Sequence, residues 1–169
     1  MSYSEFVRSR VKSGEKIAEE MTPHKAAILE TRCQRMVLEG DLLDMVKKYV
    51  FYNKQNEASD VLLPAKLVDK FPVLQLTKEQ SELLHAASGV VTEGTELLDA
   101  ISKHVFDGQP LDEDNIIEEL GDLCFYLEAA MQAIKMKRAD IEELNMAKLF
   151  ERYKDGYSDQ QAQERKDKQ

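Results

Sequence analysis

Two pairs of acidic residues, each in phase with an apolar helical stripe, constrain this chain more than any other feature. The first pair is Glu93 and Glu96 in VVTEGTELLDAI, and the second is Glu119 and Asp122 in NIIEELGDLCFYL. The two residues of each pair are three positions apart, so a helix projects both side chains from one face. If the two helices pack side by side, four carboxylates converge on one point.

The four carboxylates would repel one another unless a cation lies between them, and oxygen ligands suit Mg²⁺ or Mn²⁺. The spacing alone is weak evidence, because 32 of the 169 residues are acidic. The phase is more informative, since Glu93 shares a helical row with Val90 and Leu97, and burying an unpaired charge is costly. The sequence therefore predicts a hard-metal site. The alternative interpretation is that Glu93 and Glu119 each pair with a Lys or Arg at the edge of the core.

The remaining pattern predicts helices and no strand. Thr22-Pro23 is a typical helix start, and Thr77 with Gln80 forms a capping box. The first four expected helices cover residues 3–20, 22 to about 55, 77–106 and 112–137. Asp140 and Glu143 start a fifth helix, which reaches about Tyr153. Ser158 and Gln161 cap a short polar helix after it. Residues 57–76 hold Pro64 and Pro72 and are expected to be irregular, with room for one short helix. The predicted fold class is all-α, a helical bundle with short connections.

Charge and composition exclude several classes of function. The formal net charge is −9 and the pI about 4.9, which argues against binding to nucleic acid or to an anionic membrane. Cys33 and Cys124 both lie in helical patterns, so small core fillers are expected rather than a disulfide, and a cytoplasmic, reducing compartment fits. We expect no signal peptide or membrane span, because no apolar run approaches the necessary length.

The acidic pairs and a third motif together resemble a known family. The order E-x-x-E, E-x-x-D and then N-x-x-K-x-x-x-R-Y resembles the MazG-like, all-α nucleoside triphosphate pyrophosphohydrolases. In the third motif, NMAKLFERY, the matching residues are Asn145, Lys148, Arg152 and Tyr153. The resemblance covers residues 77–167. It implies a pyrophosphohydrolase core over 77–167, with residues 1–76 as an N-terminal helical extension that packs on the core or on a partner subunit.

The resemblance also implies an activity. Family members cleave (deoxy)nucleoside triphosphates to the monophosphate and pyrophosphate, control or clean the nucleotide pool, and usually form homodimers or homotetramers. Mg²⁺, with Mn²⁺ as a substitute, would be bound by the four motif acids, Glu93, Glu96, Glu119 and Asp122. We expect in-line attack by a metal-held water, with Glu96 as the acceptor of its proton and Glu119 as the second catalytic carboxylate.

Several further residues are candidates for contacts with the substrate. Asn145, Lys148 and Arg152 form one polar line on a helix, so the two cations are suited to phosphates, with Tyr153 next in the motif. A solvated basic face is the alternative. Lys103 lies two turns after Glu96 and is a second phosphate candidate. His85 lies two turns before Glu93 and is a candidate for contact with the base or sugar, although a packed core histidine is the simpler interpretation.

Three other functions compete with this one. A di-iron carboxylate bundle calls for two Glu-x-x-His motifs, and only Glu82 and His85 form one. A dUTPase-like or dCTPase-like enzyme on the same fold would differ only in a few pocket contacts, and phosphoribosyl-ATP is a more distant substrate. A non-catalytic helical module, or a regulatory nucleotide binder, would keep the acidic pairs without turnover. Finally, the long helix after Pro23 is expected to bury its apolar stripe against a partner subunit.

Overall fold

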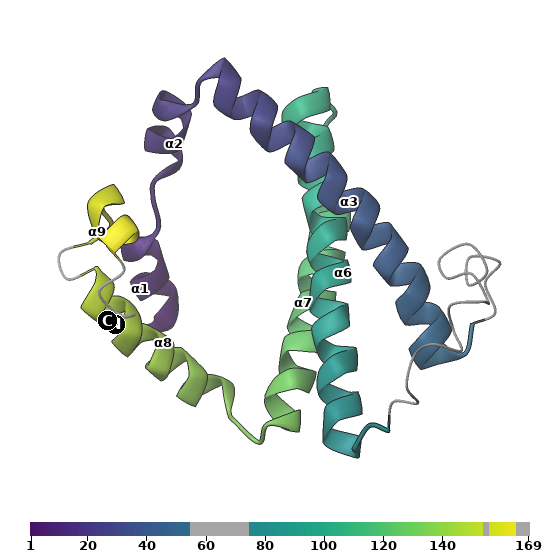
Figure 1. Cartoon of the computed structure of the whole chain (residues 1–169). Coiled ribbons are helices and arrows are strands. Elements are labelled where there is room, and N and C mark those ends of the chain that lie inside the picture. Colours follow the sequence, from purple (N-terminus) through teal and green to yellow (C-terminus); the bar gives the residue numbers. More distant parts are fainter. Residues whose placement is uncertain (55–74, 154–155, 165–169) are drawn as a thin grey trace. The chain divides into compact units, whose positions relative to one another are not determined.

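The computed structural model describes residues 1–54, 75–153 and 156–164, and these residues form helices and no strand (Figure 1). The prediction of an all-α fold is confirmed. In chain order the helices are α1 (Tyr3–Arg10), α2 (Gly14–Glu20), α3 (Pro23–Tyr52), α6 (Lys78–Asp107), α7 (Glu113–Ala133), α8 (Arg138–Arg152) and α9 (Asp159–Glu164). None of these helices is both long and apolar enough to cross a membrane.

The helices divide into two compact units. One unit combines Met1–Ala26 with Met136–Gln169, and the other is Ala27–Lys135. Each unit draws on both of the segments expected from the sequence, 1–76 and 77–167.

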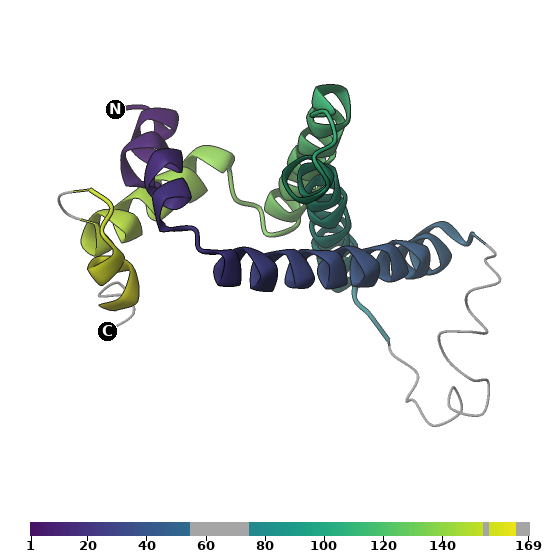
Figure 2. The same ribbon diagram turned by 90° about the horizontal axis from the view of Figure 1, so that it is seen from above.

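Helices α6 and α7 form the centre of the unit Ala27–Lys135 and lie side by side along their length (Figures 1 and 2). The residue at the crowded point is Gly89, where an added Cβ would lie 2.2 Å from the ring of Tyr126. Tyr126 and Glu119 are both buried on α7 and are seven residues apart, so they share the face that α6 covers. The packing of the two helices therefore brings Glu119 into the interior.

Helix α3 crosses α6 in both views (Figures 1 and 2). Its buried residues are Cys33, Gly40 and Lys47, which are spaced seven apart and so form one narrow stripe. An added Cβ on Gly40 would lie only 2.0 Å from Thr95 Oγ1 on α6, so the glycine permits the close approach. This contact fixes the stripe of α3, and with it Lys47, against α6.

The ends of α6 and α7 follow from local sequence. The Thr77 hydroxyl accepts a hydrogen bond from the backbone amide of Gln80 at 3.2 Å. The side-chain carbonyl of Gln80 accepts one from the backbone amide of Thr77 at 2.9 Å. Gly108 ends α6 in the left-handed region, with φ of 67°. The side chain of Asp112 then caps α7 by accepting a hydrogen bond from the backbone amide of Asn115. These signals confirm the predicted capping box and set where the acidic residues fall along the helices.

The other unit is held together by contacts between its two chain segments. Phe6 on α1 is fully buried, and its ring lies 4.8 Å from that of Phe150 on α8. The guanidinium of Arg10 covers both rings, at 5.5 and 5.1 Å from their centroids. The Tyr3 hydroxyl donates to Asn145 Oδ1 at 3.2 Å. Helix α1 is therefore part of the packing of α8.

Four predictions about the elements are wrong in detail. The expected helix 3–20 is interrupted, because Val11 is extended and Ser13 caps a new helix, α2. Helix α7 ends at Ala133, four residues early, and Lys135 has φ of 58°. Helix α8 starts at Arg138, so Asp140 and Glu143 form no capping box. Cys33 is buried as expected, but Cys124 is exposed.

Other expectations are confirmed or fall outside the described residues. Thr22 accepts from the Lys25 amide at 3.3 Å at the start of α3, and Ser158 accepts from the Gln161 amide at the start of α9. The irregular region expected at 57–76 lies outside the described residues, apart from its last two positions.

Candidate metal centre

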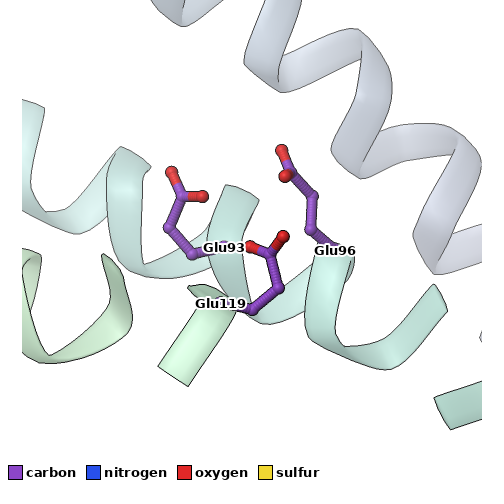
Figure 3. Close-up of side chains that lie close together, drawn as sticks. All are labelled: Glu93, Glu96 and Glu119. Carbon is purple, nitrogen blue, oxygen red and sulfur yellow. The ribbon is translucent and has the colours of Figure 1, made fainter. Parts of the chain in front are cut away.

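Three of the four predicted acidic ligands meet in one cluster. Glu93 and Glu96 come from α6 and Glu119 from α7, and their carboxylates face a common space (Figure 3). One oxygen atom from each lies within 4.8 Å of the others. Glu93 and Glu119 are each only 6% exposed, and Glu96 is half-buried. We call these three residues the acidic cluster.

Asp122, the fourth predicted ligand, lies outside this group. Its side chain is exposed on α7, and no oxygen of it belongs to the acidic cluster. Its charge still reaches the cluster, because it is one of the carboxylates that raise the pKa of Glu119.

Glu119 has the least favourable environment of the three. Its Oε2 atom is buried and has no hydrogen-bond partner. Burial, followed by the charges of Glu96, Glu93 and Asp122, raises the pKa of Glu119 to about 7. Burial, followed by the charges of Glu93 and Asp44, also raises the pKa of Glu96 above its usual value. Both shifts arise because negative charge is concentrated away from water.

Glu93 differs because it already has a cationic partner. Lys47 Nζ on α3 lies 2.8 Å from Glu93 Oε1, 2.7 Å from Thr92 Oγ1 and 3.1 Å from Asp44 Oδ1. Burial alone would lower the pKa of Lys47, but the hydrogen bonds to Glu93 and Asp44 hold it above its usual value. The alternative interpretation from the sequence, a glutamate paired with a lysine, thus describes Glu93 and not Glu119.

Sequence reasoning missed both residues that α3 contributes. Lys47 and Asp44 are three residues apart in a long helix, and nothing local distinguishes them from other charged neighbours. The only signal that could have found them is their spacing from Gly40, which places Gly40, Asp44 and Lys47 on one helical face.

The acidic cluster fits a divalent cation. The donor set is entirely carboxylate oxygen, which Mg²⁺ and Mn²⁺ prefer. A buried carboxylate oxygen without a partner is rare in folded proteins, and a bound cation would satisfy Glu119 Oε2. Glu93, Glu96 and Glu119 would therefore hold the ion.

A cavity of about 550 Å³ lies between the first half of α6 and the second half of α7. His85, Phe125 and Tyr126 are among the residues that line it. The ring of His85 stacks on Phe51, with centroids 4.6 Å apart, and its Nε2 lies 2.9 Å from the hydroxyl of Tyr52. His85 is thus packed against α3 and also borders the cavity.

The remaining predicted substrate residues lie elsewhere. Lys103 binds Asp99 at 2.5 Å and lines a separate cavity to which none of the three glutamates contributes. The third motif belongs to the other compact unit. There Asn145 accepts a hydrogen bond from Tyr3, and Lys148 is exposed. Arg152 lies over the ring of Tyr153, which is buried. The role of these residues stays a prediction.

The helices and the acidic cluster define an all-α protein with a carboxylate site suited to a divalent cation. Comparison with protein families makes this more specific: residues 79–157 match the model of the MazG nucleotide pyrophosphohydrolase domain. Comparisons with curated proteins and with solved structures gave no match. The matched residues include α7 and all but the first residue of α6, but not α3, which supplies Lys47.

Proposed function

We propose that this protein is a Mg²⁺-dependent hydrolase that converts (deoxy)nucleoside triphosphates to nucleoside monophosphate and pyrophosphate. The domain family supports the class of nucleotide pyrophosphohydrolase. The observation that carries the proposal further is the acidic cluster, in which three carboxylates from two helices meet and Glu119 Oε2 has no protein partner.

The chemistry explains why an acidic protein uses such a site. A triphosphate carries about four negative charges near neutral pH, so the protein binds it only with added positive charge. Mg²⁺ held by Glu93, Glu96 and Glu119 would supply that charge and would make the attacking water more acidic. In hydrolysis, the oxygen of water forms a new bond to phosphorus, the bond between the α-phosphoryl and β-phosphoryl groups breaks, and pyrophosphate leaves with the electron pair.

The residues of the chain have separate tasks in this scheme. Glu93, Glu96 and Glu119 would hold the ion, and Glu96, which is less buried than the other two, would accept the proton of the attacking water. The 550 Å³ cavity has room for a base, and His85 and Phe125 present ring surfaces to it. Asn145, Lys148 and Arg152 are proposed to contact the phosphates, on the strength of the family motif.

The test is a product analysis with a matched pair of variants. The purified protein is incubated with each common NTP and dNTP and with dUTP, in Mg²⁺ or in EDTA, and the phosphorylated products are separated. Glu119→Gln removes the buried cluster carboxylate. Glu118→Gln makes the same change at the exposed neighbouring residue and is the control.

We expect monophosphate and pyrophosphate from the wild type and from Glu118→Gln, and neither product in EDTA or from Glu119→Gln. Diphosphate and phosphate would retain the metal site and reject the reaction type. Absence of turnover with every substrate, from folded protein, would favour a nucleotide-binding role without catalysis. A strong preference for dUTP or dCTP would identify the narrower enzyme on the same fold.

A further inference from the structure

Lys47 is a buried cation in contact with the acidic cluster. Only 4% of the residue is exposed, and its ammonium touches Glu93, Asp44 and Thr92. The Nζ atom also lies 5.2 Å from the centroid of the Tyr126 ring, within range of a cation–π interaction. The ammonium is therefore fully enclosed by groups that favour a positive charge.

The position of Lys47 matters because its ammonium binds a carboxylate that a metal ion would also need. Glu93 is both a partner of Lys47 and one of the three glutamates whose oxygen atoms lie within 4.8 Å of one another. A carboxylate that already neutralises an ammonium offers less to a second cation, and two cations only a few ångströms apart repel each other. The Lys47–Glu93 pair and a divalent cation thus compete for one carboxylate.

We propose that Lys47 acts as an internal counter-ion of the acidic cluster, which stabilises the metal-free state and weakens the binding of divalent cations in the absence of substrate. The proposal rests on the acidic cluster being the metal site of the proposed function. Its consequence is that the ion binds best together with a triphosphate, because the phosphates supply the negative charge that Lys47 offsets.

The proposal assigns a role to a helix outside the matched family domain. Gly40 brings α3 close to α6, and the stripe from Gly40 to Lys47 then delivers the ammonium to Glu93. Lys47 is a positioning residue in this account, since it acts on the metal through Glu93 and Asp44.

The experiment measures Mn²⁺ binding by titration calorimetry on the full chain without nucleotide, with Mg²⁺ as competitor. Lys47→Met removes the charge at nearly constant length, and Lys47→Arg retains it. Lys48→Met is the matched control, because Lys48 binds the same Asp44 but 42% of its side chain is exposed, against 4% for Lys47.

We expect Lys47→Met to bind Mn²⁺ at least about tenfold more tightly than the wild type, because a competing charge is gone. The Mn²⁺ affinity of Lys47→Arg should stay within about threefold of the wild type, because the charge is retained. The affinity of Lys48→Met should also stay within about threefold, because solvent screens the charge of Lys48. In EDTA, Lys47→Met should melt at a lower temperature than the wild type, and Mn²⁺ should raise its melting temperature by more.

Unchanged or weaker Mn²⁺ binding by Lys47→Met would overturn the proposal and leave Lys47 as a structural link between α3 and α6. An equal gain in Mn²⁺ affinity from Lys48→Met would also overturn it, since the effect would then follow from the total charge of the protein and not from the contact with Glu93. If Lys47→Met does not fold in EDTA, Lys47→Gln replaces it, because the amide is neutral and can still donate to Glu93. The measurement needs no turnover, so a failure of the proposed hydrolysis would be seen separately.

Discussion

At the scale of single residues, Glu119 determines how the acidic cluster responds to protons. The raised pKa of about 7, against 4.5 for an ordinary glutamate, means that the folded, metal-free protein binds a proton at Glu119 more tightly than the unfolded chain does. The stabilising contribution of that proton is fully present below pH 4.5 and is lost as the pH rises through 7. Metal-free protein is therefore destabilised by its own site near neutral pH.

This leads to a prediction for Glu119→Gln in EDTA. The substituted amide carries no charge, so the free energy of unfolding of the variant should exceed that of the wild type by an amount that grows between pH 4.5 and 8. The added difference should reach about 3 kcal/mol at most, from the shift in pKa. Urea unfolding at several pH values measures it, with Glu118→Gln as the control. Parallel pH profiles for the wild type and Glu119→Gln would contradict the prediction.

A second residue-scale prediction concerns the cavity between α6 and α7 that His85 borders. His85→Ala should raise the KM for the preferred nucleotide about tenfold, because one ring surface facing the cavity is lost, with Mn²⁺ affinity unchanged. The control is His104→Ala, since His104 lies near the end of the same helix, where its ring binds the Gln109 carbonyl. A KM equal to that of the wild type would show that His85 only packs against Phe51 and Tyr52.

The residues of the acidic cluster were largely predictable, and their cationic partner was not. Glu93 and Glu119 stand on apolar rows, and the phase of a helix is a local property that a sequence displays. Lys47 is one of 23 Lys and Arg residues, and it meets Glu93 across 46 positions of sequence. Such a pairing depends on how α3 crosses α6, which local patterns do not encode.

At the scale of helices, two glycines decide how closely α3, α6 and α7 approach. Gly40 admits Thr95, and Gly89 admits the ring of Tyr126. Gly94 is also inside α6, yet nothing lies within 4 Å of the position its Cβ would take. The three glycines therefore differ in role although all three are helical.

Substitution by alanine should separate these roles. Gly40→Ala should lower the free energy of unfolding by about 1–3 kcal/mol, because the new Cβ overlaps with Thr95. Gly94→Ala should raise it by about 0.5–1 kcal/mol, because alanine restricts the unfolded chain and favours the helix. Urea unfolding with a constant m-value measures both. Equal effects at the two positions would contradict the close approach of α3 and α6.

Helix boundaries show which local signals decide structure. The capping box of Thr77 and Gln80 was predicted correctly because both reciprocal hydrogen bonds are possible within four residues. The similar signal at Asp140 and Glu143 was misleading, since α8 already starts at Arg138. The break after Arg10 was missed because Ser13 caps α2 through a single hydrogen bond to the Lys16 amide, without an acidic or amide partner.

At the scale of the whole molecule, the described residues leave much apolar surface in contact with water. The fold class was predictable, since repeated caps and apolar rows favour helices everywhere, but the partner of each apolar row was not. On α3 several large apolar side chains are 40–64% exposed: Ile28, Leu29, Met36, Leu38, Leu42, Tyr49 and Val50. Exposed apolar surface of this extent is typical of an interaction site.

We propose that a second copy of the chain covers exposed apolar side chains of α3, as the sequence led us to expect. Light scattering should give a mass of two or four chains at micromolar concentration. Leu38→Asp, at the most exposed of these positions, should lower the mass to that of one chain, because a buried unpaired carboxylate opposes association. Leu144→Asp, the same change at an equally exposed leucine on α8, is the control. A wild-type protein that remains monomeric would contradict the proposal.

The bond between Tyr3 and Asn145 joins residues 142 positions apart, and this separation has a consequence during synthesis. A ribosome adds about 5–20 residues per second, so α1 is synthesised roughly 7–28 seconds before the segment of α8 that packs on it. For that interval the first helix of the nascent chain has no native partner. It gains that partner only when α8 has been translated.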